Sequence, residues 1–373
     1  MTRVVVGEFL KGEKTPKIIG VGESETKGMR HGYVTDIASC VQSLKDAVAL
    51  AEKSSNIRIR RAFIGIGGVT LRGDMSTGIG IITKADGEVT NLDITKALED
   101  SENNLNLNNK KVIKVFPLAF KLDGKEILGR PEGMRGTKLE VKSLFVTCSL
   151  SHFEDLIEVV SKAGIEPIDI VATPIAGSLM AMSSKQKVVG GALVDIGSET
   201  VSLAVFENSI LVYLHTFPIG GNDITNDIAL GMKISLEEAD QFKLGNIKEG
   251  YAKKKLDEII EARLFDVFEL IENHLKKIKR NELLPAGVIF IGGSANIPLI
   301  LEYSKSALKL PSSVGSTNMF GNIKTKLRDP AWFTALGLIT PSEEEGSYHQ
   351  DSLHNIFQNL KSILKSNIKQ LMP

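Results

Sequence analysis

The sequence is short of cysteine, of net charge and of long apolar runs, and each shortage excludes a class of protein. Its two cysteines, Cys40 and Cys148, lie far apart and belong to no CxxC or Cys/His cluster, which argues against a disulfide framework and a zinc site. The 45 basic and 45 acidic residues cancel, so no nucleic-acid partner is indicated. No apolar run reaches the roughly 18 residues that a membrane-spanning helix needs, and the first residues lack a signal-peptide core. We therefore expect a protein of the reducing cytoplasm that is neither secreted nor membrane-spanning.

The length and the order of apolar segments indicate two α/β lobes with a cleft between them. A chain of 373 residues exceeds one ordinary hydrophobic core, and strands alternate with helices along most of it. For the first lobe we expect strands at 3–8, 17–22, 61–65, 144–148 and 168–172 and helices at 37–53 (capped by Asp36), 152–163 and 175–182. For the second lobe we expect strands at 190–196, 201–206, 210–217 and 287–291, a helical region at 222–280 and a helix from residue 297.

Residues 67–143 differ from the rest of the chain in their pattern of predicted elements. Short β-like runs surround one predicted helix near 94–104, and charged loops occupy 123–126 and 129–137. The pattern predicts a small α+β module that is inserted into the first lobe and ends near Ser143.

Three turns that contain glycine follow strands of the second lobe, at 195–200, 220–221 and 292–294. Backbone N–H groups of such turns can point at phosphate oxygens, and an aspartate at the end of a strand can hold Mg²⁺ through water. Taken alone, the first turn could equally be an ordinary hairpin. Together the three turns predict a nucleotide site. The residues that they supply are Asp195, Gly197, Thr200, Gly220, Gly221, Gly292, Gly293 and Ser294.

The order of these motifs resembles the FtsA family of bacterial division proteins, within the actin-like ATPase superfamily. The segments that carry the resemblance are IIGVGES at 18–24, VTCS at 146–149, DIGSET at 195–200, FPIGGNDIT at 217–225, EEAD at 237–240, FIGGSA at 290–295 and AWFTALGLI at 331–339. The resemblance spans essentially the whole chain. It implies an α/β, two-lobed actin-like ATPase fold in which the inserted module is the FtsA-specific subdomain 1C.

The resemblance also implies a division of the chain into subdomains. These are 1A at 1–66 and 144–188, 1C at 67–143, 2A at 189–232 and 285–340, 2B at 233–284, a linker at 341–351 and an amphipathic membrane-targeting helix at 352–373.

The same resemblance assigns roles in binding ATP and Mg²⁺. The turn at 195–200 would be the second phosphate loop, with Asp195 holding Mg²⁺ through water. Gly220 and Gly221 would flank the nucleotide, and residues 292–294 would form the adenosine motif. Asp240 and Lys243, about one helical turn apart, would reach the ribose and base. From the residues alone, a solvated ion pair is the alternative for these two.

Three departures from the family pattern bear on ATP. The family's first phosphate loop, a strand ending in DIGT-S, belongs ahead of Arg3, and without it weak or no ATP binding is expected. Within the second loop, Ser198 and Glu199 replace small residues, and the extra carboxylate repels a polyphosphate unless Mg²⁺ or an outward rotation intervenes. Thr173 precedes Pro174 where many superfamily members have a glutamate that positions water. We therefore expect at most a slow ATPase, with no catalytic residue assigned.

The C-terminal segment has the pattern of an amphipathic helix. No acidic residue follows Asp351, and a cationic apolar helix can lie on an anionic membrane. A helix packed on the protein's own core or on a partner is the alternative; the acidic linker at 341–346 and the FtsA resemblance favour the membrane. The residues expected to contact lipid are Leu353, Ile356, Phe357, Leu360, Lys361, Ile363, Leu364, Lys365, Ile368, Lys369 and Leu371.

The resemblance implies a structural adaptor at the division site, on the cytoplasmic face of the cell membrane. Such an adaptor polymerises on inner-membrane anionic lipids, binds the C-terminal peptide of FtsZ through subdomain 2B and recruits other divisome proteins. One alternative is a PilM-like platform protein of a type IV pilus or secretion system, which would need no amphipathic tail. Another is a phosphotransferase of the sugar-kinase branch, for which no motif supplies a catalytic aspartate and a sugar pocket.

Overall fold

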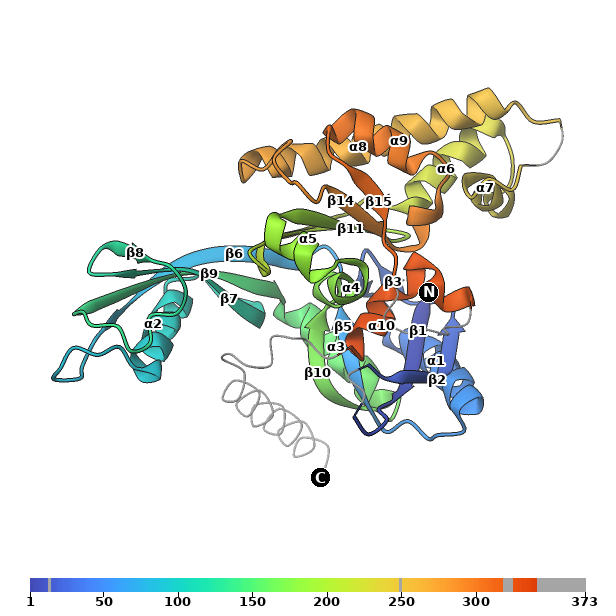
Figure 1. Cartoon of the computed structure of the whole chain (residues 1–373). Helices are drawn as coiled ribbons and strands as arrows, with labels where there is room; N and C mark the ends of the chain where they lie inside the picture. Colours follow the sequence, from blue (N-terminus) through green and yellow to red (C-terminus); the bar gives the residue numbers. More distant parts are fainter. Residues whose placement is uncertain (13–14, 248–249, 318–324, 341–373) are drawn as a thin grey trace.

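The computed structural model describes residues 1–12, 15–247, 250–317 and 325–340. They form two α/β lobes and a third, elongated part that projects to one side (Figure 1). The linker and the amphipathic helix expected at 341–351 and 352–373 lie outside the described residues. No helix within the described ranges is long and apolar enough to cross a bilayer.

The second lobe is built on a five-strand section of sheet in the order β15-β14-β11-β12-β13. Its central strand, β11, is parallel to β14 and antiparallel to β12. The strands are β11 (Gly191–Ile196), β12 (Val201–Glu207), β13 (Ile210–Phe217), β14 (Val288–Ile291) and β15 (Ser312–Val314). Almost every residue of β11, β12 and β14 is buried, as expected for strands that are covered on both faces.

Helices cover both faces of this section of sheet. One face packs against α6 (Gly221–Met232), α7 (Leu236–Lys243), α8 (Lys253–Lys277) and α9 (Ile300–Leu308). Side chains on the opposite face, such as Leu193 and Ile291, join the core that contains α4 (Thr173–Ala181) of the first lobe. The two lobes therefore share a hydrophobic core along α4.

The first lobe contains two separate pairs of strands. β1 (Thr2–Glu8) is antiparallel to β2 (Lys17–Ser24), and β5 (Arg61–Ile66) is parallel to β10 (Glu166–Ala172). Around them lie α1 (Ile37–Ser55), α3 (Leu150–Lys162), α10 (Phe333–Leu338) and the short hairpin of β3 (Met29–Arg30) and β4 (Tyr33–Val34). Helix α10 contacts both β1 and β5.

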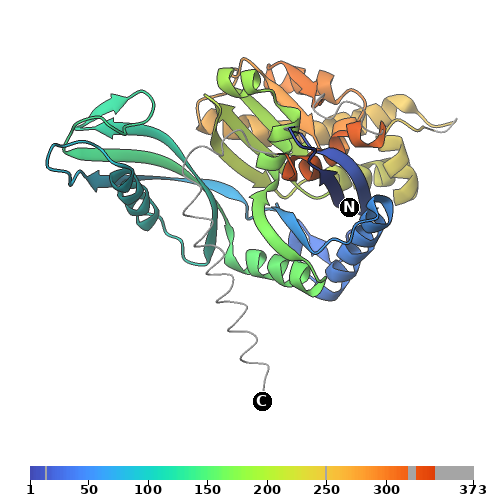
Figure 2. The same cartoon turned by 60° about the horizontal axis from the view of Figure 1, so that its bottom comes forward.

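The inserted part carries three long strands and one short one in the order β6-β9-β7-β8, and it extends away from both lobes (Figure 2). It consists of β6 (Arg72–Ile81), α2 (Asn91–Asn103), β7 (Lys110–Leu122), β8 (Lys125–Ile127) and β9 (Lys138–Ser149). It has its own core, which includes Ile94, Phe120 and Val141. One residue pair, His215 and Arg72, joins its sheet to β13.

The expectation of only short β-runs in this region was wrong, since β6 has 10 residues, β7 has 13 and β9 has 12. The strand expected at 144–148 is found, but it is the end of the longer β9, which pairs with β6 and β7 from Lys138 onward. Elsewhere the expected elements are found within a few residues of their predicted bounds, while α5 (Ser184–Val189), β15 and α10 were not predicted.

Candidate nucleotide site

The three glycine turns predicted to hold nucleotide meet at the junction of the two lobes. The backbone N–H of Gly221 donates to the carbonyl oxygen of Gly197 at 2.9 Å, and that of Asn222 donates to Ser198 at 2.7 Å. The hydroxyl of Ser294 lies 3.5 Å from the carbonyl oxygen of Gly197. The end of β11, the start of α6 and the end of β14 are thus held together at one place.

Glycine is required where these turns touch. A Cβ on Gly220 would lie 2.6 Å from the carbonyl oxygen of Ser198, and one on Gly221 would lie 2.3 Å from the hydroxyl of Ser294. Gly292 has a φ of +89°, and its Cβ would lie 2.4 Å from the carboxylate of Asp195. A Cβ on Gly293, in contrast, would meet nothing within 4 Å, so a ligand has room to approach the backbone there.

Asp195 is a nearly unpartnered carboxylate at the end of β11. The hydroxyl of Thr334 donates to it at 3.4 Å. Burial raises the pKa of Asp195 to about 6, while the Thr334 hydroxyl and the nearby charge of Arg3 act in the opposite direction. A cation beside it would offset this cost. Within the described ranges no group of three His, Cys, Asp or Glu side chains could hold a metal, so Mg²⁺ would bind through Asp195, water and phosphate oxygens.

Lys243 is buried and makes three hydrogen bonds to the protein. Its ammonium donates to Asp240 at 2.6 Å, to the hydroxyl of Thr225 at 2.7 Å and to the carbonyl oxygen of Gly221 at 3.2 Å. The Lys243 side chain is 7% exposed and that of Asp240 is 49% exposed, so the solvated ion pair is wrong for Lys243. All three ammonium donors are used. In this arrangement Asp240 is the member of the pair with an oxygen open to a ligand hydroxyl.

Glu199 points away from its own turn toward the first lobe. Its carboxylate accepts a hydrogen bond from the backbone N–H of His31 at 2.6 Å. The ring Nδ1 of His31 lies 3.0 Å from the backbone oxygen of Glu199. This orientation corresponds to the outward rotation that would lessen repulsion of a polyphosphate.

A cluster of cations near Asp195 was missed by sequence reasoning. Arg3 pairs with Glu23 at 2.9 Å, and Lys326 pairs with the other oxygen of Glu23 at 2.7 Å. Both cations lie over the ring of Trp332, at 5.4 and 5.1 Å from its centroid. Trp332 and Thr334 belong to the AWFTALGLI segment, whose similarity to the family was the signal that could have identified them.

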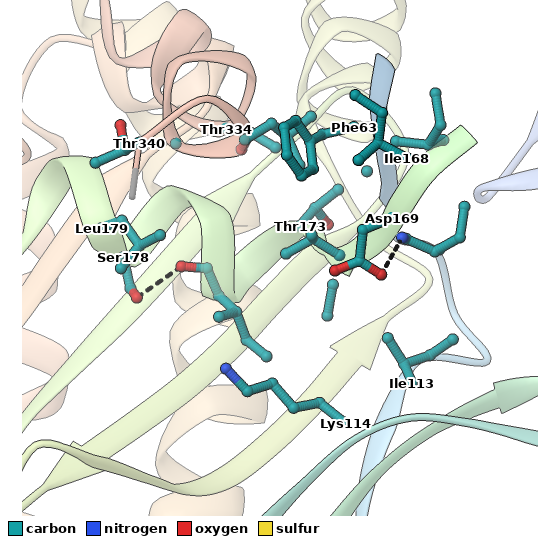
Figure 3. A pocket seen from close by; sticks show the side chains of 18 of the residues that line it. Phe63, Ile113, Lys114, Ile168, Asp169, Thr173, Ser178, Leu179, Thr334 and Thr340 are labelled. Atoms are coloured by element: carbon teal, nitrogen blue, oxygen red, sulfur yellow. Dashed lines mark hydrogen bonds between the residues drawn. The ribbon is translucent and has the colours of Figure 1, made fainter. Parts of the chain in front are cut away.

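A large cavity in the first lobe reaches the same junction. Its lining includes Thr173 and Thr334 together with Phe63, Ile113 and Lys114, all labelled in Figure 3. Thr173 begins α4 where β10 ends. No carboxylate occupies that position.

Comparisons with known proteins match most of the chain. A family model described as cell division protein FtsA matches residues 192–337, and one described as the SHS2 domain inserted in FtsA matches residues 68–147. Cell division protein FtsA of Bacillus subtilis is 30% identical over 360 residues, which cover 91% of this chain and 80% of that protein. FtsA of Pseudomonas aeruginosa is 27% identical over 345 residues, covering 87% and 82%.

A solved structure of the PilM-PilN type IV pilus biogenesis complex is also similar. Its TM-score is 0.65 at 16% sequence identity, and the match covers 90% of this chain and 93% of that one. At this identity the likeness concerns the fold alone.

Proposed function

The chain belongs to the FtsA family of cell division proteins, and we propose that it is an ATP-binding, actin-like adaptor that acts on the membrane at the division site. The proposed binding of ATP is supported by one observation: three glycine turns meet beside Asp195 at the junction of the lobes. Glycine turns with converging backbone donors suit phosphate groups, and a lone carboxylate suits Mg²⁺.

The roles proposed in this site follow its geometry. Residues 195–200 and the N-terminus of α6 face the phosphates, and residues 292–294 receive the adenosine. Asp240 accepts from the ribose, while Lys243 holds Asp240 and the start of α6 in place. Thr173 supplies no carboxylate to orient water, so hydrolysis is slow or absent.

Calorimetry with Mg-ATP tests the nucleotide proposal. We expect binding weaker than about 1 µM that requires Mg²⁺ and disappears in Asp195→Ala. Glu237→Gln, an exposed change on α7, is the matched control and leaves binding unchanged. Equal binding by the Asp195→Ala chain would refute the site.

The membrane part of the proposal rests on residues 352–373 and on family membership. Co-sedimentation with anionic liposomes compares the full chain with one that ends at Tyr348. A triple change of Lys361, Lys365 and Lys369 to glutamine separates charge from apolar contact. We expect only the full chain to pellet, with high salt and the triple change both weakening it. Equal pelleting of full and shortened chains would refute the anchor.

We further propose that filaments of this chain tether FtsZ and recruit other divisome proteins. Many weak anchors on one filament bind a membrane together far more strongly than one alone. A fluorescent FtsZ C-terminal peptide should bind the full chain. Substitutions of surface residues within 233–284 should weaken this binding more than substitutions of surface residues elsewhere. A PilM-like role would instead predict binding of a peptide from a PilN-like partner and no response to liposomes.

A further inference from the structure

The short hairpin of β3 and β4 lies where the candidate nucleotide site meets the first lobe. The carboxylate of Glu199, in the turn at 197–200, accepts from the backbone N–H of His31 at 2.6 Å. The ring of His31 adds a contact with the backbone oxygen of Glu199 at 3.0 Å. Each strand of this hairpin has only two residues, and a hairpin so small is not stable alone. Its position therefore depends on contacts with its surroundings.

The same hairpin holds the segment through which the chain enters the inserted part. Residues 67–71 connect β5 to β6. The backbone N–H of Val69 donates to the carbonyl oxygen of His31 at 3.1 Å. Gly32 packs so closely on Gly68 that a Cβ on Gly32 would lie 2.3 Å from the Cα of Gly68. A shift of the hairpin turn would therefore disturb this segment directly.

The segment through which the chain leaves the inserted part is tied to the same place. Helix α3 follows β9 without a gap, and the ring of His152 in its first turn is buried. The hydroxyl of Thr70 is hydrogen-bonded to Nδ1 of His152 at 2.9 Å. The ring of Tyr33 in β4 lies beside that of His152, with centroids 5.3 Å apart. We refer to the two connecting segments, 67–71 and 149–152, as the root of the inserted part.

We propose that these contacts form a clasp between the candidate site and the inserted part. In this clasp Glu199 of the second lobe holds the turn of the β3–β4 hairpin, and the hairpin holds the root. Breaking the contact between Glu199 and His31 would therefore loosen the root, although no contact within the root is altered. The clasp is a conformational device that connects two regions far apart in the sequence.

The charge of Glu199 makes the clasp sensitive to an anion at the turn 197–200. A polyphosphate bound there repels the carboxylate that is held against His31, whereas a released carboxylate can turn into solvent, where the repulsion is screened. A ligand shifts a conformational equilibrium toward the state that it binds better. Mg-ATP would therefore open the clasp and loosen the root. This consequence rests on the proposed function, whereas the clasp itself does not.

Hydrogen exchange without nucleotide tests the clasp itself. Glu199→Ala removes the acceptor of the His31 N–H, whereas Glu199→Gln retains an acceptor and is the matched control. We expect exchange over 67–71 to be at least about tenfold faster than in the parent chain for Glu199→Ala, and within about twofold of it for Glu199→Gln. Exchange over 138–147, within β9, should be the same in all three chains.

Three results of this comparison would overturn the clasp. The first is unchanged exchange over 67–71 in Glu199→Ala. The second is equal acceleration in Glu199→Ala and Glu199→Gln, which would exclude a role for the acceptor oxygen. The third is equal acceleration over 138–147, which would indicate a general loss of stability.

The response to Mg-ATP is measured over the same segment, after calorimetry has established saturation. Binding that only stabilises the fold slows exchange, so exchange over 67–71 that becomes at least about threefold faster is the distinguishing result. Glu199→Gln lacks the repelled charge and should show no acceleration. If Mg-ATP binds without this acceleration, the coupling is refuted and the nucleotide site stands. If calorimetry shows no binding, the proposed nucleotide function fails, and the comparison without nucleotide still decides the clasp.

Thr70→Val tests the coupling from the opposite end, because the effects of two coupled sites on each other are reciprocal. The change removes the hydroxyl that is bound to His152 and leaves the candidate site untouched, while Thr70→Ser keeps the hydroxyl. A looser root should favour the open clasp, so the dissociation constant of Mg-ATP should fall about fivefold in Thr70→Val and stay unchanged in Thr70→Ser. Equal constants in the parent and Thr70→Val chains would overturn the coupling.

Discussion

Glu199 of the second lobe accepts a hydrogen bond from the backbone N–H of His31 in the first lobe at 2.6 Å. The contact joins the turn at 197–200 to the turn between β3 and β4, and the imidazole of His31 adds a second interaction with the backbone of Glu199. A carboxylate that is part of a phosphate-facing turn is thus held by the opposite lobe. Its negative charge nevertheless remains close to the place proposed for the phosphates.

Changing Glu199→Gln should strengthen binding of Mg-ATP. Glutamine retains an oxygen that accepts from the backbone N–H of His31 but carries no negative charge. Removing one repulsion between two like charges that are partly exposed to solvent is worth about 1 kcal/mol. The dissociation constant measured by calorimetry should fall about fivefold. Glu154→Gln on the exposed side of α3 is the control and should leave it unchanged. An unchanged constant in Glu199→Gln would mean that the phosphates do not sense this charge.

Changing Asp195→Asn should stabilise the nucleotide-free protein at neutral pH. The pKa of Asp195 is raised from 3.8 to about 6 because of burial, so between those values the native state holds a proton that the unfolded chain has released. Stability is therefore lost as pH rises from about 4 to 6, and the loss is complete above 6. Removing the ionisable group should recover about 1–3 kcal/mol at pH 7.5.

Urea unfolding at pH 4 and pH 7.5 measures this effect. Asp195→Asn should exceed the parent chain in stability at pH 7.5 and equal it at pH 4, while Glu237→Gln should follow the parent chain at both. The same Asp195→Asn chain should lose binding of Mg-ATP, as Asp195→Ala should, because both changes remove the carboxylate proposed to hold Mg²⁺. A lower stability at pH 7.5 would show that the charged carboxylate has a partner strong enough to stabilise it.

Changing Lys243→Met should destabilise the second lobe. The substitution removes the three hydrogen bonds that the buried ammonium donates to Asp240, to the hydroxyl of Thr225 and to the carbonyl oxygen of Gly221. Loss of such bonds costs about 1–3 kcal/mol of unfolding free energy. Lys254→Met is the control, because Lys254 is 91% exposed and lies 4.0 Å from Glu258, and the change there should stay within about 0.5 kcal/mol. Equal effects of the two changes in urea unfolding would contradict the role of Lys243.

Local patterns in the sequence were sufficient to predict many individual helices and strands. Asp36 caps α1 as predicted, because its carboxylate accepts from the backbone N–H groups of Ala38 and Ser39, and β13 has the predicted bounds. Family resemblance supplied the actin-like fold, and the match to FtsA confirms it. The subdomain boundaries and the assigned nucleotide contacts stay predictions.

Contacts between distant segments could not be predicted from local patterns. Glu199 and His31 are 168 residues apart, and Thr334 and Asp195 are 139 apart, so no periodicity connects them. Helix α5 has no buried residue, which removes the apolar spacing on which helix prediction depends. The length of β9 follows from its two neighbouring strands, and its own sequence carries only part of that signal.

Changing His274→Phe should reduce the sensitivity of the protein to mild acid. The ring of His274 stacks on His215 with centroids 4.3 Å apart, and its Nδ1 is hydrogen-bonded to the hydroxyl of Tyr213. Burial, together with the charges of His215 and Lys277, lowers the pKa of His274 from 6.5 to about 4. As pH falls from about 6.5 to 4, the unfolded chain takes up a proton that the native state does not, and stability is lost over that range.

The expected size of this loss is about 1–2 kcal/mol, because the ring is partly solvated and the full shift overstates it. Urea unfolding at pH 7 and pH 4.5 should therefore show a difference between the two pH values that is smaller by that amount in His274→Phe. Lys277→Gln tests the cause separately, since removing a neighbouring positive charge raises the pKa of His274 and should narrow the difference in part. At pH 7 the His274→Phe chain should lose about 1 kcal/mol of unfolding free energy because the hydrogen bond to Tyr213 is gone. A loss of packing alone would give a decrease of similar size, so stability at pH 7 does not distinguish the two causes. Only a smaller difference between the two pH values would show that the imidazole of His274 is a source of the acid sensitivity. Equal acid sensitivity of the parent and His274→Phe chains would mean that other groups cause it.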